Sequence, residues 1–119
     1  MKKMLIIVNP FSGKGKNSEI IPYVTKILSQ KYECIIYKTS CPGDGEQAAE
    51  NASDDIDVIT CIGGDGTMSE VASGVSKNPR DIPIGYIPTG TTNDFAKGLG
   101  IPLDYISAAQ HILNGKRCV

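Results

Sequence analysis

A glycine-rich turn that carries one aspartate is the segment of this sequence best suited to chemistry. It runs from Gly63 to Thr67 as Gly-Gly-Asp-Gly-Thr, after an apolar run and before residues with helical spacing. Glycines let a bound phosphate approach the main chain closely, and the N–H groups at the start of the following helix attract anions. A carboxylate at such a place is useful if a cation binds together with the phosphate. The turn therefore predicts a site for a nucleotide and Mg²⁺, with Asp65 beside the metal.

The same residues allow a purely structural interpretation. Thr67 and Glu70 have the spacing of a capping box, in which Thr67 is the N-cap of the helix and Glu70 returns to its N–H. Two of the glycines could serve only a tight turn. A capping box does not require Gly-Gly-Asp-Gly before it, however, and this excess favours a binding site.

Two further polar turns that contain glycine follow apolar runs. Residues 9–16, Asn-Pro-Phe-Ser-Gly-Lys-Gly-Lys, have neither the spacing of a P-loop nor that of the dinucleotide fingerprint, so this turn alone is a weak signal. Residues 88–98 form the other turn and include Asp94, a second carboxylate of the kind that an Mg²⁺–phosphate site uses. Asn93 and Asp94 are also ordinary turn and cap residues.

Apolar runs and helical patterns alternate around these turns. The helix after the second apolar run is expected to begin with a capping box from Asp44 to Gln47, and residues 116–119 look like the first residues of another strand. Strands are expected at residues 4–8, 33–38, from 57 and 83–87, and helices at 18–31, from 44, from 67 to before 78 and 105–114.

This alternation predicts an α/β fold with a mainly parallel sheet covered by helices on both faces, in three α/β/α layers. Ligands of such sheets bind beyond the carboxyl ends of the strands. The turns at Asn9–Lys14, Thr39, Gly63–Thr67 and Thr89–Asp94 all lie at those ends. Their convergence on one edge is stronger evidence for a site than any single turn.

Size and charge exclude several classes of protein. With 119 residues the chain is long enough for a single domain with a core, and a net charge of −1 gives no basic surface for nucleic acid. The first apolar run is too short for a secretory signal or a membrane span, which predicts a cytoplasmic protein. Cysteines without metal-ligand spacing are expected to be free thiols, with Cys34 and Cys61 buried in strands. The single histidine, His111, does not support a nucleophilic triad.

Three motifs occur together: Asn9-Pro10-x-Ser12-Gly13, Gly63-Gly64-Asp65-Gly66-Thr67 and Pro88-x-Gly90-Thr91-x-Asn93-Asp94-Phe95-Ala96. In this order they resemble the nucleotide-binding domain of soluble bacterial diacylglycerol kinases and related lipid kinases, which are akin to sphingosine kinases, NAD kinases and phosphofructokinase. The resemblance implies an NAD kinase/phosphofructokinase-like nucleotide-binding domain over residues 1–119. Departures are Thr89, where the family has Leu, and Ser69, where Asn is common.

The resemblance also implies a set of site residues. A water-mediated Mg²⁺ network is implied at Asp65 and Asp94, the two residues expected to act in catalysis. Contacts to ATP are implied for Asn9, Pro10, Phe11, Ser12, Gly13, Thr39, Gly64, Asp65, Gly66, Thr67, Met68, Ser69, Glu70 and Thr91.

The activity implied by the resemblance is transfer of the γ-phosphoryl group of ATP to the hydroxyl of diacylglycerol or a similar lipid. Members of the family are longer and carry a second, β-rich domain with the lipid cleft and a glutamate general base. Without that domain, this chain is expected to bind ATP and Mg²⁺ weakly and to turn over little. The expected partners are ATP, a lipid bound through the second domain and, transiently, a membrane surface, and a homodimer is compatible with the resemblance.

Three other functions are compatible with the turns. An NAD-kinase-type enzyme is also built around Gly-Gly-Asp-Gly-Thr. A nucleotide-sensing module would bind nucleotide without transferring phosphate. A flavodoxin-like domain would have such turns without Mg²⁺-dependent ATP binding.

Overall fold

A parallel sheet forms the centre of the structure, a computed structural model that describes residues 1–11, 17–89, 98 and 104–114. Its strands are β1 (Lys2–Val8), β2 (Tyr32–Lys38), β3 (Ile56–Gly63) and β4 (Ile84–Pro88). Their order is β2-β1-β3-β4, and each neighbouring pair is parallel. The helices of the described residues are α1 (Asn17–Leu28), α2 (Asp44–Glu50), α3 (Asp65–Lys77) and α5 (Tyr105–Leu113).

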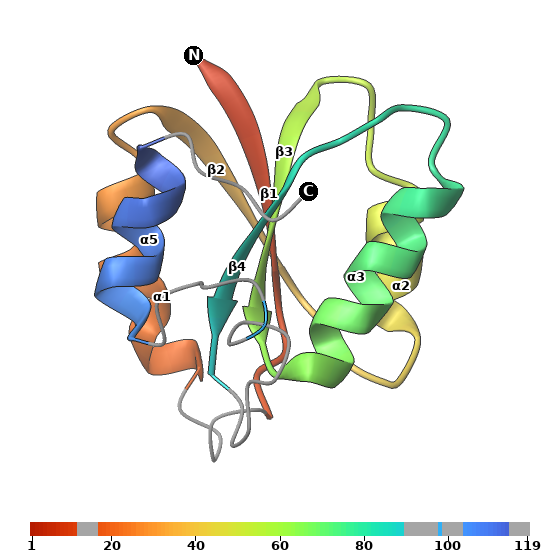
Figure 1. Cartoon of the computed structure of the whole chain (residues 1–119), viewed down its shortest axis with the longest axis horizontal. Coiled ribbons are helices and arrows are strands. Elements are labelled where there is room, and N and C mark those ends of the chain that lie inside the picture. Colours follow the sequence, from red (N-terminus) through yellow and green to blue (C-terminus); the bar gives the residue numbers. More distant parts are fainter. Residues whose placement is uncertain (12–16, 90–97, 99–103, 115–119) are drawn as a thin grey trace.

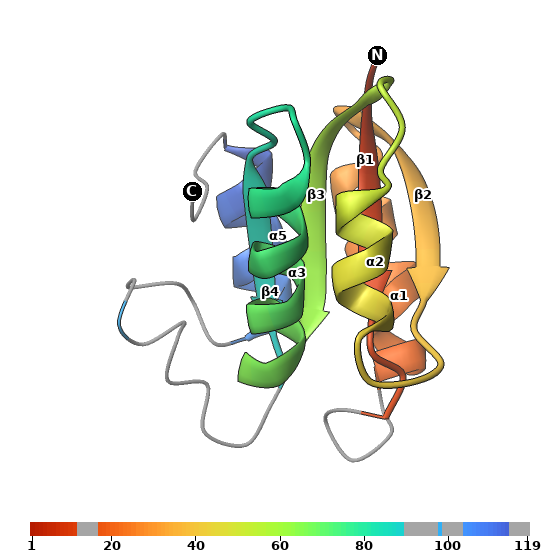
Figure 2. The same cartoon turned by 90° about the vertical axis from the view of Figure 1, so that its right-hand side faces the viewer.

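Helices cover both faces of this sheet. Figure 1 shows α1 and α5 on one side and α2 and α3 on the other, and Figure 2 shows α2 and α3 in front of the strands. The predicted α/β fold with three layers is therefore confirmed. Among the described residues no helix combines the length and hydropathy that crossing a bilayer requires.

The central strand β1 explains why the core has two halves. Its residues from Met4 to Val8 are buried, because a parallel strand covered on both faces is apolar throughout. Met4, Ile6 and Val8 pack with side chains of α1 and α5, whereas Leu5 and Ile7 pack with those of α2 and α3. Each layer of helices is thus held by alternate residues of the same strand.

The helices α2 and α3 lie in direct contact. A Cβ atom at Gly74 of α3 would lie 2.2 Å from the main-chain oxygen of Glu46 in α2 and 2.8 Å from Cβ of Ala49. Lys77 also forms an ion pair with Glu46 at 2.6 Å. Asn78 donates from Nδ2 to the main-chain oxygen of Glu50 at 3.1 Å. These contacts fix α2 against α3 along its length.

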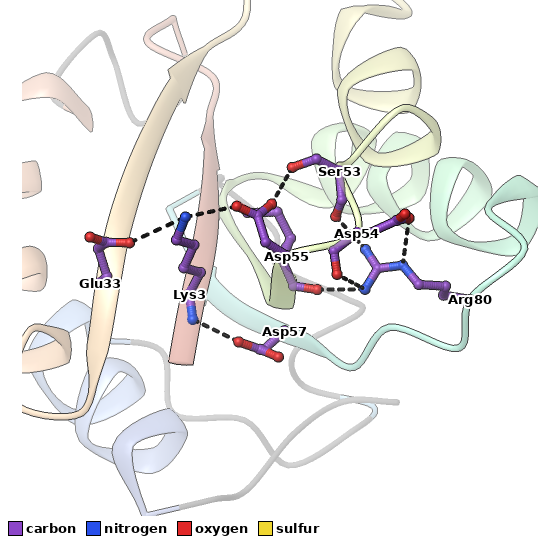
Figure 3. Close-up of polar contacts among 8 residues, drawn as sticks. Lys3, Glu33, Ser53, Asp54, Asp55, Asp57 and Arg80 are labelled. Atoms are coloured by element: carbon purple, nitrogen blue, oxygen red, sulfur yellow. Dashed lines mark hydrogen bonds and ion pairs between the residues drawn. The ribbon is translucent and has the colours of Figure 1, made fainter. Parts of the chain in front are cut away.

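Polar side chains join the amino ends of the strands. Lys3 of β1 forms ion pairs with Asp55 at 2.7 Å and with Glu33 at 3.7 Å (Figure 3). Arg80 donates to the main-chain oxygens of residues 53, 54 and 56, which connect α2 to β3 (Figure 3). The amino edge of the sheet is therefore held by charged side chains.

The structure differs from the sequence-based expectations at the start of α2 and at one cysteine. The predicted cap at Asp44 is wrong: Gly43 is the N-cap of α2, at φ 88°, and Asp44 is the first helical residue. Cys61 is buried as expected, but Cys34 is only half-buried because β2 lies at the edge of the sheet. The strand expected at residues 116–119 lies outside the described residues.

Candidate nucleotide site

A cavity lies at the carboxyl ends of β1, β2 and β3, where the arrowheads of the strands point in Figure 1. Its volume is about 470 Å³, within the range of about 300–1,000 Å³ of small-molecule sites. Three turns from separate parts of the sequence form it, as the position of ligand sites in parallel sheets predicts. The lining residues are Asn9, Phe11, Thr39, Ser40, Cys41, Pro42, Gly64, Gly66, Thr67 and Glu70.

The glycine turn places the start of α3 at this cavity. Gly64 is the N-cap residue in an extended conformation, and as a glycine it has no side chain with which to cap the helix. The first N–H groups of a helix have no partner within the helix, so they are donors for an anion. Gly64 and Gly66 both line the cavity, which brings these donors to its wall.

Gly63 has a different task from its neighbours in the turn. A Cβ atom at this position would lie 2.8 Å from both Cβ and Oγ1 of Thr67. Only glycine therefore allows β3 to pass directly into α3 at this angle. Around Gly66, in contrast, a Cβ atom would meet nothing within 4 Å.

The predicted capping box at Thr67 and Glu70 is wrong. Because α3 begins at Asp65, Thr67 is its third residue and cannot be the N-cap. Glu70 accepts a hydrogen bond from the main-chain N of Gly45, at the start of α2, at 3.2 Å. Both residues line the cavity, and the capping-box interpretation of their spacing does not hold.

Asn9 connects the end of β1 to the glycine turn. Its Nδ2 donates to Oγ1 of Thr67 at 3.2 Å, and its Oδ1 accepts from the main-chain N of Phe11 at 2.9 Å. Its main-chain oxygen accepts from Asn17, a buried residue of α1. Asn17 was not predicted as part of the site, and its burial as a polar residue could be seen only in the structure.

The end of β2 supplies the third turn. Thr39 is buried and donates from its main-chain N to the oxygen of Val8 at 2.9 Å, which continues the pairing of β1 and β2. The next residues, Ser40, Cys41 and Pro42, line the cavity and were missed in the sequence. The one signal for them was their position directly after Thr39. Phe11, 75% exposed, lines the same cavity.

The other predicted residues are placed as follows. The side chain of Met68 is buried in the core between α3 and the sheet, and Ser69 is exposed. Pro10 and Asp65 flank lining residues without lining the cavity themselves. Thr89 donates from its main-chain N to the oxygen of Gly63 at 2.9 Å, so the third motif begins beside the glycine turn. Ser12, Gly13, Thr91 and Asp94 lie outside the described residues.

Within the described part of the chain, no three His, Cys, Asp or Glu side chains form a group that could hold a metal by themselves. This is compatible with Mg²⁺, which keeps several waters and uses one or two carboxylates together with substrate phosphates. Asp65 lies at the first position of α3, between two residues that line the cavity, and Glu70 lines it directly. Their oxygens are of the kind that Mg²⁺ prefers.

Comparison with known proteins identifies the family. Residues 3–118 match the model of the family described as the diacylglycerol kinase catalytic domain. This chain belongs to that family. A diacylglycerol kinase of Bacillus subtilis (strain 168) is 41% identical to it over 118 residues, and one of Staphylococcus saprophyticus is 38% identical over 116 residues. The predicted resemblance is thus confirmed.

Solved structures agree with this assignment to the diacylglycerol kinase catalytic domain family. A putative diacylglycerol kinase from Bacillus anthracis str. Sterne matches 96% of this chain with a TM-score of 0.88 and 30% identity. The match covers 42% of that chain, and the Bacillus subtilis relative is covered to 39%. The chain therefore spans about two fifths of the length of the relatives that it matches.

Proposed function

We propose that this chain is the nucleotide-binding part of a lipid kinase, which transfers the γ-phosphoryl group of ATP to the hydroxyl of diacylglycerol or a similar lipid. Membership of the diacylglycerol kinase catalytic domain family supports the reaction class. The observation that carries the proposal is the cavity at the carboxyl edge of the sheet, with the start of α3 behind its glycine N-cap in its wall. A polyphosphate is the ligand class that such a wall suits best.

Phosphoryl transfer depends on positioning and on neutralising charge more than on covalent chemistry. In the proposed complex, the main-chain N–H groups of the first turn of α3 hold phosphate oxygens. Asn9 and Thr67, hydrogen-bonded to each other, place two polar side chains next to those donors. Phe11 and the Ser40–Pro42 turn form the walls away from the helix and are proposed to surround the nucleoside.

Magnesium, when bound, would neutralise charge on the phosphates during transfer. Asp65, at the start of α3, and Asp94 of the third motif are proposed to hold the water molecules that surround the magnesium ion. This chain covers 39% of the Bacillus subtilis relative. The lipid-binding site and the general base are proposed to belong to the portion of such kinases that lies outside this chain.

Calorimetry with Mg²⁺ and ATP tests the binding step on the 119-residue chain, and we expect Mg²⁺-dependent binding. The full-length gene product that contains this chain should phosphorylate diacylglycerol and leave NAD unmodified. Asp65→Asn in that protein should lower kcat by about 10²- to 10³-fold, the loss typical of an electrostatic group at a transferring centre. Asp81→Asn, at an exposed aspartate outside the cavity, is the matched control and should keep full activity.

Phosphorylation of NAD in place of diacylglycerol would replace the proposal by an NAD-kinase-type reaction. Nucleotide binding with neither activity would indicate a sensing module. Absence of Mg²⁺-dependent ATP binding by the chain would overturn the site itself.

A further inference from the structure

The turn after β2 forms one wall of the cavity. Ser40, Cys41 and Pro42 line the cavity between the end of β2 and the start of α2. The turn closes at Gly43, whose φ of 88° favours glycine. A short exposed turn of this kind has few apolar contacts to hold it, so its shape depends on its hydrogen bonds.

Asp44 makes those hydrogen bonds. Its Oδ2 accepts from the main-chain N of Ser40 at 2.8 Å and from Oγ of Ser40 at 3.2 Å. Its own main-chain N donates to the oxygen of Cys41 at 3.2 Å. Among the described residues, Ser40 and Cys41 both form their hydrogen bonds with Asp44. One residue therefore ties the cavity wall to the first turn of α2.

Tyr37 fixes the carboxylate that does this. Its hydroxyl, on β2, donates to Oδ1 of Asp44 at 2.6 Å. The hydrogen bonds from the Tyr37 hydroxyl and the Ser40 main chain hold the pKa of Asp44 below its ordinary value, so the acceptor is ionised at neutral pH. An aspartate that capped α2 would direct its oxygens to the N–H groups of the helix. The carboxylate of Asp44 is directed backwards, to the turn and to the strand.

The start of α2 is also fixed from the opposite side. Gly45 donates to Glu70 of α3 at 3.2 Å, and a Cβ atom at Gly45 would lie 3.1 Å from the same carboxylate oxygen. Since α2 packs directly against α3 at Gly74, the wall formed by the turn has a fixed distance from the start of α3. The two walls of the cavity are thus joined through α2.

We propose that Asp44 is a positioning residue for the nucleotide, which acts without touching it by holding the Ser40–Pro42 wall in its binding conformation. This inference rests on the proposed function of the cavity. Two effects of the carboxylate would have opposite consequences for affinity. As a negative charge in the same cavity wall as an anionic nucleotide it would weaken binding, whereas as a clamp it strengthens binding. The sign of the change on its removal decides between them.

Calorimetric titration of the 119-residue chain with ATP and Mg²⁺ makes this test. Asp44→Ala should raise Kd about 3- to 10-fold, which corresponds to a binding-competent fraction of about 10–30% once the clamp is lost. Asp44→Asn should restore most of the affinity, because the amide oxygen can accept from Ser40 while the amide nitrogen donates to Tyr37. Tyr37→Phe, which removes one donor and leaves the Ser40 bonds, should give a smaller rise.

The matched control is Asp55→Ala. Asp55 is exposed, whereas Asp44 is half-buried, but it likewise accepts from a serine hydroxyl and one other side chain. It lies at the amino edge of the sheet (Figure 3). The substitution Asp55→Ala should lower the free energy of unfolding without changing the Kd for ATP. In the full-length gene product, Asp44→Ala should raise the KM for ATP about as much as Kd and leave kcat within about 2-fold, since uniform binding alone is lost.

An unchanged or lower Kd for Asp44→Ala, with normal binding by the wild-type chain, would overturn this inference and leave the proposed function intact. A wild-type chain that binds no nucleotide would overturn both. If Asp44→Ala does not fold, Tyr37→Phe decides by the same criterion, because it leaves the main-chain bonds of the turn in place.

Discussion

At the scale of single residues, the site depends on contacts that tolerate very little added volume. Gly63, at the end of β3, leaves room for the side chain of Thr67 in the first turn of α3. Oγ1 of Thr67 accepts a hydrogen bond from Asn9, which follows β1, so the three segments meet at Thr67. Gly66, in the first turn of α3, has open space around it. Two glycines of one motif therefore have different physical roles.

Replacing these two glycines separates the roles. Gly63→Ala should lower the free energy of unfolding by about 1–3 kcal/mol, the usual cost of forcing extra volume into a packed place. Gly66→Ala should be neutral or stabilising by up to about 1 kcal/mol, because alanine restricts the unfolded chain and meets nothing in the fold. Urea unfolding of the 119-residue chain measures both, and equal losses for the two variants would contradict this assignment.

At the scale of elements, the two edges of the sheet have different chemistry. The carboxyl edge exposes main-chain donors at the start of α3 and carries the cavity. The amino edge is closed by Lys3 with its acidic partners and by Arg80 on the connection from α2 to β3 (Figure 3). Ion pairs at the far edge hold the strands together without occupying the edge that carries the cavity.

Stability should depend on pH through this amino edge. The hydrogen bond from Lys3, followed by that from Ser53, lowers the pKa of Asp55 from 3.8 to about 2. A lowered folded pKa stabilises the fold above the unfolded value, so this contribution is present above about pH 4 and is lost between about pH 4 and pH 2. The wild-type chain should therefore lose more free energy of unfolding over that interval than Asp55→Asn does.

Lys3→Met provides the control for this pH dependence, since it removes the partner and leaves the carboxylate. It should flatten the same interval, and added salt should reduce the difference between wild type and both variants because these groups are exposed. Parallel curves for wild type and Asp55→Asn would show that the ion pair does not stabilise the fold.

At the scale of the whole molecule, three separate turns share one cavity only because β1, β2 and β3 are parallel neighbours. The chain that carries this cavity covers 39% of the Bacillus subtilis relative, and in the proposed enzyme the lipid binds outside this chain. The α2–α3 contact makes the nucleotide part a single packed unit.

The 119-residue chain should therefore bind ATP and Mg²⁺ but transfer phosphate to diacylglycerol far more slowly than about 1 s⁻¹, the lower limit for typical kinases. Incubation with labelled ATP and dispersed lipid, followed by lipid extraction, measures this rate. The full-length gene product in the same assay is the positive control. Rates of kinase magnitude from the chain alone would mean that the general base lies within these residues.

The order of elements, the parallel sheet and the edge that carries the site could be predicted from the sequence. Buried strands such as β1 are continuous apolar runs, and the position of polar turns after them follows from the direction of parallel strands. Gly64, Thr67 and Asn9 could be placed at the cavity by the same reasoning. These features are local in sequence or follow from general rules of topology.

Only the tertiary structure decided what the ambiguous polar residues do. Thr67, Glu70 and Asp44 all have capping-box spacing, yet the N-caps of their helices are Gly64 and Gly43. Their side chains bond to residues on other elements. For the lining by Ser40, Cys41 and Pro42 there was no signal in the sequence beyond their position after Thr39, because the lining depends on how α2 packs on α3. Sequence spacing limits what a side chain can reach along its own helix, but the partner that it bonds is chosen by the packing of separate segments.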